Sequence, residues 1–116
     1  MRAPLPPPPY YAVIFTSQRT TVDGGYDDMA DRMVALAAEQ PGYLGVESAR
    51  GDDGLGITVS YWRSPEDIAA WRRHGEHQIA RDTGRSDWYR HYTLRVAKVE
   101  RAYDWAREDG NQDPNA

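Results

Sequence analysis

A short turn in the middle of the chain constrains the fold more than any other feature. Gly51-Asp52-Asp53-Gly54 separates two short runs that contain many apolar residues, Tyr43–Arg50 and Leu55–Trp62. Two strands joined by a short Gly/Asp turn form an antiparallel hairpin. The sequence therefore predicts a hairpin at the centre of the fold.

A helix is predicted before the hairpin, over Tyr26–Gln40. Apolar residues recur there at the spacing of one helical face, and Pro41-Gly42 ends the pattern. The stripe consists of Tyr26, Met29, Met33, Leu36 and Ala37.

A second helix is predicted after the hairpin. Ser64-Pro65-Glu66-Asp67 has a serine cap, a proline at the first helical position and an acid at the third. Ile68 and Trp71 face inward at helical spacing. We expect Gly75 to bend or break this helix, with Glu76–Asp82 as a second helical piece.

Two further strands, Tyr10–Ser17 and Tyr89–Tyr103, are predicted at the ends of the domain. The order β-α-β-β-α-β is the ferredoxin-like arrangement. It predicts an α+β fold in which two helices cover one face of a four-stranded antiparallel sheet. Apolar side chains point to both faces of the predicted sheet, but the helices cover only one of them. An exposed apolar face of that size marks an interface. We therefore expect a homodimer.

The flanking segments differ in composition from the folded part. Residues 1–9 are predicted to be a flexible Pro-rich arm, residues 10–104 the domain, and residues 105–116 a polar C-terminal tail.

Glu47 and Arg95 alternate with apolar neighbours on strands, so they could pair across the sheet or across a dimer seam.

The overall charge excludes some partners. A formal net charge of −4 and a pI near 5.3 argue against binding to nucleic acid or to an anionic membrane. The chain has no cysteine, no signal-peptide pattern and no apolar run of membrane-spanning length. We expect a cytoplasmic protein.

Several motifs together resemble the antibiotic biosynthesis monooxygenase family of dimeric α+β barrel proteins. They are Gln40-Pro41-Gly42-Tyr43-Leu44-Gly45, then Ser60-Tyr61-Trp62, then Ser64-Pro65-Glu66, followed by Trp71 and His77. The resemblance implies two sheets packed face to face in a dimer, with a pocket between the sheet and helices of each subunit. Some members oxidise polycyclic aromatic substrates with dioxygen and without metal or flavin, and others degrade haem.

The haem-degrading branch fits this sequence poorly. Its members place an asparagine in the first strand, a tryptophan in the second helix and a haem-ligating histidine ten residues later. Here Tyr10–Ser17 contains no asparagine, and the residue ten positions after Trp71 is Arg81. Without this histidine the haem iron has no axial ligand from the protein, and haem degradation depends on that bond. A haem-handling protein is therefore the least favoured alternative.

Oxygenation without a cofactor needs a base, hydrogen-bond donors and a dry pocket. His77 and His74 are the candidate catalytic bases, since a neutral histidine suits this role near pH 7. The structural alternatives are a histidine on a polar helix face for His77 and a boundary side chain for His74. The two could share a metal, but Glu76 and Asp82 are poorly placed as a third ligand, so we expect neither a metal nor another cofactor.

Four aromatic residues are the candidates for substrate binding: Trp71, Tyr61, Tyr11 and Phe15. The structural alternative for Trp71 is filling core volume. The sequence thus predicts a monooxygenase acting on a small aromatic or polyketide-like molecule. The alternative from a different class is a non-enzymatic dimer that binds a small hydrophobic ligand, or a stress-related protein.

Overall fold

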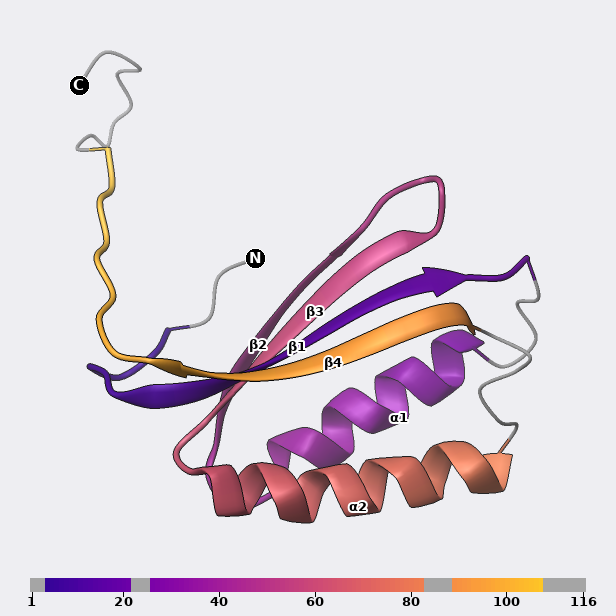
Figure 1. Ribbon diagram of the computed structural model, residues 1–116, viewed down its shortest axis with the longest axis horizontal. Coiled ribbons are helices and arrows are strands. Elements are labelled where there is room, and N and C mark those ends of the chain that lie inside the picture. Colours follow the sequence, from indigo (N-terminus) through magenta and orange to yellow (C-terminus); the bar gives the residue numbers. More distant parts are fainter. Residues whose placement is uncertain (1–3, 22–25, 83–88, 108–116) are drawn as a thin grey trace.

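The computed structural model describes residues 4–21, 26–82 and 89–107; residues 26–30 and 75–82 are described by their backbone alone. The elements are β1 (Tyr10–Arg19), α1 (Tyr26–Ala38), β2 (Tyr43–Arg50), β3 (Leu55–Trp62), α2 (Pro65–Asp82) and β4 (Tyr89–Val99). The strands form one antiparallel sheet in the order β2-β3-β1-β4, and both helices lie on one face of it (Figure 1). The predicted ferredoxin-like α+β fold is confirmed.

The central hairpin follows the prediction because its turn is built from local contacts. The Gly51 amide donates to the Leu55 carbonyl at 2.9 Å, and the Gly54 amide donates to the Gly51 carbonyl at 3.0 Å. Gly54 has a φ of 87°, a conformation that glycine adopts without steric cost. The Asp53 carboxylate accepts from the Leu55 amide at 3.1 Å.

Three predicted boundaries were wrong. β1 ends at Arg19 rather than Ser17, because Gln18 and Arg19 still pair with His91 and Tyr89 of β4. α1 ends at Ala38 rather than Gln40, because the next amides bond three residues back, Glu39 to Leu36 and Gln40 to Ala37, as in a tightened last turn. β4 ends at Val99 rather than Tyr103. Val99 pairs with Tyr10, the first residue of β1, and the preceding Pro9 has no amide hydrogen with which to continue the ladder.

The expected break at Gly75 was also wrong, because α2 is continuous from Pro65 to Asp82. A single interior glycine costs only about 1 kcal/mol relative to alanine, which a helix packed against a sheet can absorb. The predicted start is present: the Asp67 amide donates to Ser64 Oγ at 3.1 Å, and the Ser64 hydroxyl donates to the Asp67 carboxylate at 2.9 Å.

The core lies between the helices and the sheet. Its buried members are Val13, Ala37, Trp62 and Ile68, and the partly buried Tyr11, Tyr43, Trp71 and Leu94 pack against them. We call this side of the sheet the helix face and the other side the open face. The open face is also apolar, and Leu55 and Ile57 of β3 remain 48% and 46% exposed there.

The strand order rules out a pair between Glu47 and Arg95 across the sheet of one chain. Glu47 lies on β2 and Arg95 on β4, the two opposite edges of the sheet, so they do not pair across it as the sequence had allowed. In the part of the chain that the structure describes, no helix is long and apolar enough to cross a membrane.

Candidate functional site

The aromatic residues singled out from the sequence lie on two different faces of the sheet. Tyr11 is directly opposite Trp62 in the β1–β3 register, so Tyr11 and, four residues on, Phe15 belong to the helix face. Tyr61 is directly opposite Ala12, on the open face. Side chains alternate between the faces along a strand. The structure therefore does not bring Tyr61 together with Tyr11, Phe15 and Trp71.

On the helix face, a stack of rings leads from the core to the surface. Trp62 is fully buried, and its indole N–H donates to Ser60 Oγ at 2.9 Å. The Trp71 ring stacks on it, with 6.1 Å between centroids and 24° between planes. His74 follows one turn later, with its ring centroid 5.9 Å from that of Trp71, and it is exposed. Trp71 thus fills core volume on one side and contacts a candidate base on the other.

A second group of rings occupies the same face, near the end of β1 that leads into α1. The centroid of Phe15 lies 5.5 Å from that of Tyr89 and 5.3 Å from that of Tyr92, and the two tyrosines are 5.7 Å apart. All three side chains are half-buried. We call Phe15, Tyr89 and Tyr92 the ring cluster. It consists of three rings in mutual contact and carries two hydroxyl groups.

Tyr89 and Tyr92 were not among the residues predicted to bind a substrate. A register shift between Gln18 and Arg19 pairs Tyr89 with Arg19 and brings it onto the face of Tyr92, three residues away. Strict alternation would put residues three apart on opposite faces. A bulge of this kind leaves no signal in the sequence.

His77 lies within α2, in the stretch whose side chains are not described. The expectation that it points toward the sheet depended on a bend or break at Gly75, and α2 has no break there. Among the described residues, no three His, Asp or Glu side chains come together as a metal site.

On the open face, Tyr61 donates a 2.7 Å hydrogen bond to the Glu47 carboxylate. Its ring meets the edge of Tyr10 at a centroid distance of 5.7 Å. Burial, together with the hydrogen bond and the negative charge of Glu47, raises the pKa of the Tyr61 hydroxyl to about 12. Tyr61 is therefore a protonated hydrogen-bond donor at neutral pH and cannot serve as a base there.

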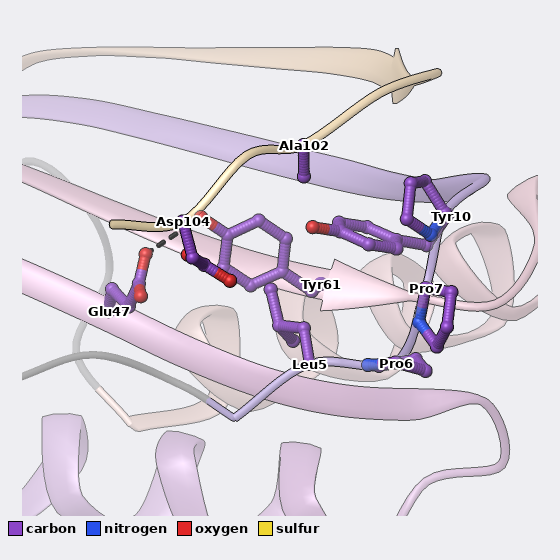
Figure 2. A pocket seen from close by; sticks show the side chains of 9 residues that line it. Leu5, Pro6, Pro7, Tyr10, Glu47, Tyr61, Ala102 and Asp104 are labelled. Carbon is purple, nitrogen blue, oxygen red and sulfur yellow. Dashed lines mark hydrogen bonds between the residues drawn. The ribbon is translucent and has the colours of Figure 1, made fainter. Parts of the chain in front are cut away.

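The Tyr61–Glu47 pair borders a cavity of about 500 Å³ on the open face (Figure 2). The lining residues are Leu5, Pro6, Pro7, Pro8, Tyr10, Glu47, Tyr61, Ala102 and Asp104. Segments from before β1 and after β4 thus lie over the same end of the sheet. Two carboxylates and two phenol rings line it, and of these four residues the sequence analysis had named only Tyr61 as a candidate for substrate binding.

Comparisons with known proteins agree with the fold. A family model described as antibiotic biosynthesis monooxygenase matches residues 25–83, a span that includes both helices and the hairpin. A Bacillus subtilis (strain 168) protein, "Uncharacterized protein YqjZ", is 62% identical over 96 residues, which are 83% of this chain and 84% of that protein.

Solved structures with low sequence identity share the architecture. A variant of SnoaB, a cofactor-independent oxygenase from Streptomyces nogalater, has a TM-score of 0.67 at 10% identity and covers 82% of this chain and 97% of its own. PA3566 from Pseudomonas aeruginosa has a TM-score of 0.63 at 14% identity, covering 83% of this chain and 97% of its own. At such identities the likeness is one of fold.

Proposed function

Because the chain belongs to the antibiotic biosynthesis monooxygenase family, we propose that it is a cofactor-independent monooxygenase that oxidises a small aromatic or polyketide-like substrate with dioxygen. The ring cluster on the helix face is the observation that carries this proposal. Phe15, Tyr89 and Tyr92 are half-buried rings that pack against one another, and the two tyrosines carry phenolic hydroxyl groups. Aromatic substrates bind such surfaces by offset or edge-to-face ring contacts.

The reaction needs little from the protein beyond a base and a dry site. A base removes a proton from an activated CH₂ group, and the resulting carbanion gives electrons to dioxygen. The peroxide that forms then loses water, so CH₂ and O₂ become C=O and H₂O. His74 or His77 is the proposed base, and Trp71, Tyr11 and Phe15 are proposed to hold the substrate. Tyr61 lies on the opposite face of the sheet, so it does not contact a substrate held there.

We also propose that the protein is a homodimer joined through the open face. Leu55 and Ile57 leave apolar area in contact with water on that face, and a second copy is the simplest cover for it. Two sheets packed face to face lie about 10 Å apart, which lets side chains of both copies interdigitate.

A second candidate function, binding of a small hydrophobic ligand without turnover, draws support from His74. Cofactor-free oxygenation requires that water be kept from the reacting anion. His74 is exposed, so a base at this position works in contact with solvent. A protein that only retains its ligand would have no such requirement.

Dioxygen consumption by the purified protein with anthrone- and quinol-like substrates distinguishes the two functions. We expect uptake by the wild type and loss of most of it in His77→Ala or His74→Ala, whichever residue is the base. His91→Ala is the matched control, because His91 is exposed on β4 and pairs with Gln18 on the open face. Product formed under ¹⁸O₂ should carry one labelled oxygen. No uptake above the uncatalysed rate, together with a ligand retained through purification, would favour the binding function.

A further inference from the structure

One row of residues crosses all four strands on the helix face, at the end of the sheet where the hairpin turn, the end of β1 and the start of β4 lie (Figure 1). Arg50 of β2 pairs with Gly56 of β3, and Gly56 pairs in turn with Ser17 of β1. Ser17 pairs with Tyr92 of β4. Directly paired residues of neighbouring strands share a face. The row therefore places an arginine and a ring of the ring cluster on one face, with only a glycine and a serine between them.

The Arg50 side chain lies along this row and is held at its far end. Neighbouring strands are about 4.8 Å apart, so β1 lies about 10 Å from β2. The guanidinium covers that distance, because one terminal nitrogen donates to Ser17 Oγ at 2.9 Å and the other donates to the Gly54 carbonyl. Ser17 is 1% exposed, so the charged group ends against a buried hydroxyl. Its positive charge is thus fixed next to β1.

Gly56 makes room for the guanidinium on the surface of the sheet. A Cβ at this position would lie 2.5 Å from Arg50 Cζ and 2.7 and 2.8 Å from its two terminal nitrogens. A glycine within a strand is typical of sites where another group approaches the backbone closely. A side chain on Gly56 would therefore push the guanidinium off the row, although Arg50 would keep its charge.

Ser17 brings this charge next to the ring cluster. Phe15 lies two residues before Ser17 on β1, about 7 Å along the strand, and Tyr92 is the partner of Ser17 on β4. Arg19, two residues after Ser17, pairs with Tyr89 and adds a second arginine at this end of the helix face. The ring cluster thus has arginines beside it on two strands.

We propose that Arg50 recognises an acidic group on the substrate, so that the substrate is an aromatic acid, such as a polycyclic carboxylate, rather than a neutral ring system. The rings of the substrate pack on Phe15 and Tyr92, and its carboxylate lies at the Arg50 guanidinium, whose planar N–H groups match a carboxylate. Arg50 is the specificity-determining residue, and Ser17 and Gly56 are positioning residues. The inference rests on the monooxygenase function proposed above and names the substrate class of that site.

Solvent limits the strength of this contact, because Arg50 is exposed. Ion pairs at exposed positions change a binding constant by up to about fivefold. We therefore expect an acidic ligand to bind about three- to fivefold more tightly than a neutral ligand of the same shape at low salt. The difference should shrink as the ionic strength rises, since salt screens exposed charges.

Quenching of tryptophan fluorescence by product-like quinones tests this preference on the full-length chain. Anthraquinone-2-carboxylate carries the acid, and anthraquinone-2-carboxamide has nearly the same shape without the charge. Wild type should bind the carboxylate with the lower Kd, whereas Arg50→Gln should bind both quinones with the wild-type Kd for the amide. Arg95→Gln is the matched control: it removes an exposed arginine from the open face, where Arg95 pairs with Ile14, and should keep the preference.

Gly56→Ala separates the position of the charge from its presence. This variant keeps Arg50 but displaces its guanidinium, so the preference for the carboxylate should fall while the Kd for the amide stays the same. A preference that survives Arg50→Gln overturns the proposal, and one that survives Gly56→Ala overturns the role of the row in holding the guanidinium. Equal weakening of both quinones in Arg50→Gln overturns the proposal too, because it shows that Arg50 only supports the fold. Failure of wild type to bind either quinone overturns the site.

Dioxygen uptake by the same samples, with anthrone and a carboxylated anthrone, reports the reaction separately. Uptake without a preference for the acid overturns the acid site and leaves the monooxygenase function standing. Preferential binding of the acid without any uptake supports the acid site and overturns the monooxygenase function.

Discussion

Replacement of Gly42 by alanine should destabilise the protein more than an ordinary surface substitution. Gly42 lies in the turn between α1 and β2 and has a φ of 85°, in the left-handed region. Its carbonyl accepts a 2.9 Å hydrogen bond from the Arg63 amide, which ties this turn to the end of the hairpin. A Cβ on Gly42 would overlap the Asp67 carboxyl group and lie 2.8 Å from Asp67 Cβ.

Two separate costs add up at this position. A non-glycine residue in the left-handed conformation costs about 1–2 kcal/mol. Displacement of the Asp67 carboxylate removes its bond with Ser64 and disturbs the start of α2, which costs about 1–2 kcal/mol more. Gly42→Ala should therefore lower the free energy of unfolding by about 2–4 kcal/mol, a large part of the roughly 5–15 kcal/mol typical of a domain.

Urea unfolding followed by tryptophan fluorescence measures this cost, at one protein concentration for all variants. A double-mutant cycle with Asp67→Gly separates the two contributions, because this change removes both the carboxyl group and the Cβ that the new methyl group would meet. In that background Gly42→Ala should cost only about 1–2 kcal/mol, the backbone part. Gly51→Ala is the control, since its φ is ordinary and the nearest atom is the flexible Asp53 carboxylate, at 3.1 Å. A cost below about 1 kcal/mol for Gly42→Ala, or strict additivity in the cycle, would refute the reasoning.

Three further predictions concern single contacts. The Tyr61 pKa of about 12 lies above the ordinary value of 10.0, so the stability due to its bond with Glu47 is fully present below pH 10 and is lost as the pH rises toward 12. Absorbance at 295 nm should show one late-titrating tyrosine that is missing in Tyr61→Phe. The same titration curve in wild type and variant would contradict this. Ser64→Ala should cost about 1 kcal/mol in urea unfolding by removing the cap of α2, whereas Ser64→Thr should cost clearly less, because it keeps a hydroxyl that can accept from the Asp67 amide and donate to the Asp67 carboxylate. Ile68→Val should lower the free energy of unfolding by about 0.5–1.5 kcal/mol, because Ile68 is buried in the core. The control Val34→Ala, at a 48% exposed position, should lower it by less. Equal losses would contradict the placement of Ile68 in the core.

Local chemistry made part of the fold predictable from sequence. The bounds of β2 and β3 match the prediction because the turn residues between them carry their own hydrogen bonds. The start of α2 matches for the same reason, as Ser64 and Asp67 bond to each other. The end of β4 does not match. It depends on where β1 begins, nearly ninety residues earlier in the sequence, and alternation within one strand contains no information about its partner.

The candidate site was less predictable, because it depends on how strands pair. Tyr11, Phe15 and Tyr61 are all aromatic strand residues, and the sequence gives no reason to separate them. Only the register, Tyr11 opposite Trp62 and Tyr61 opposite Ala12, assigns them to different faces. The register shift after Gln18 similarly adds Tyr89 to the ring cluster. The Tyr61–Glu47 hydrogen bond likewise joins two strands.

The separation of the two faces predicts that binding and assembly respond to different substitutions. Phe15→Leu removes the proposed ring contact with an aromatic substrate on the helix face, which is worth about 0.5–1.5 kcal/mol, so KM should rise about two- to tenfold while the dimer Kd stays the same. Ile57→Thr acts on the open face, so the dimer Kd should rise while KM and turnover, measured at concentrations where the variant is dimeric, stay the same. Steady-state dioxygen uptake and sedimentation on the same samples measure both quantities. If Phe15→Leu weakened the dimer as much as Ile57→Thr, the substrate pocket and the interface would share residues, and the helix face could not be the binding site alone.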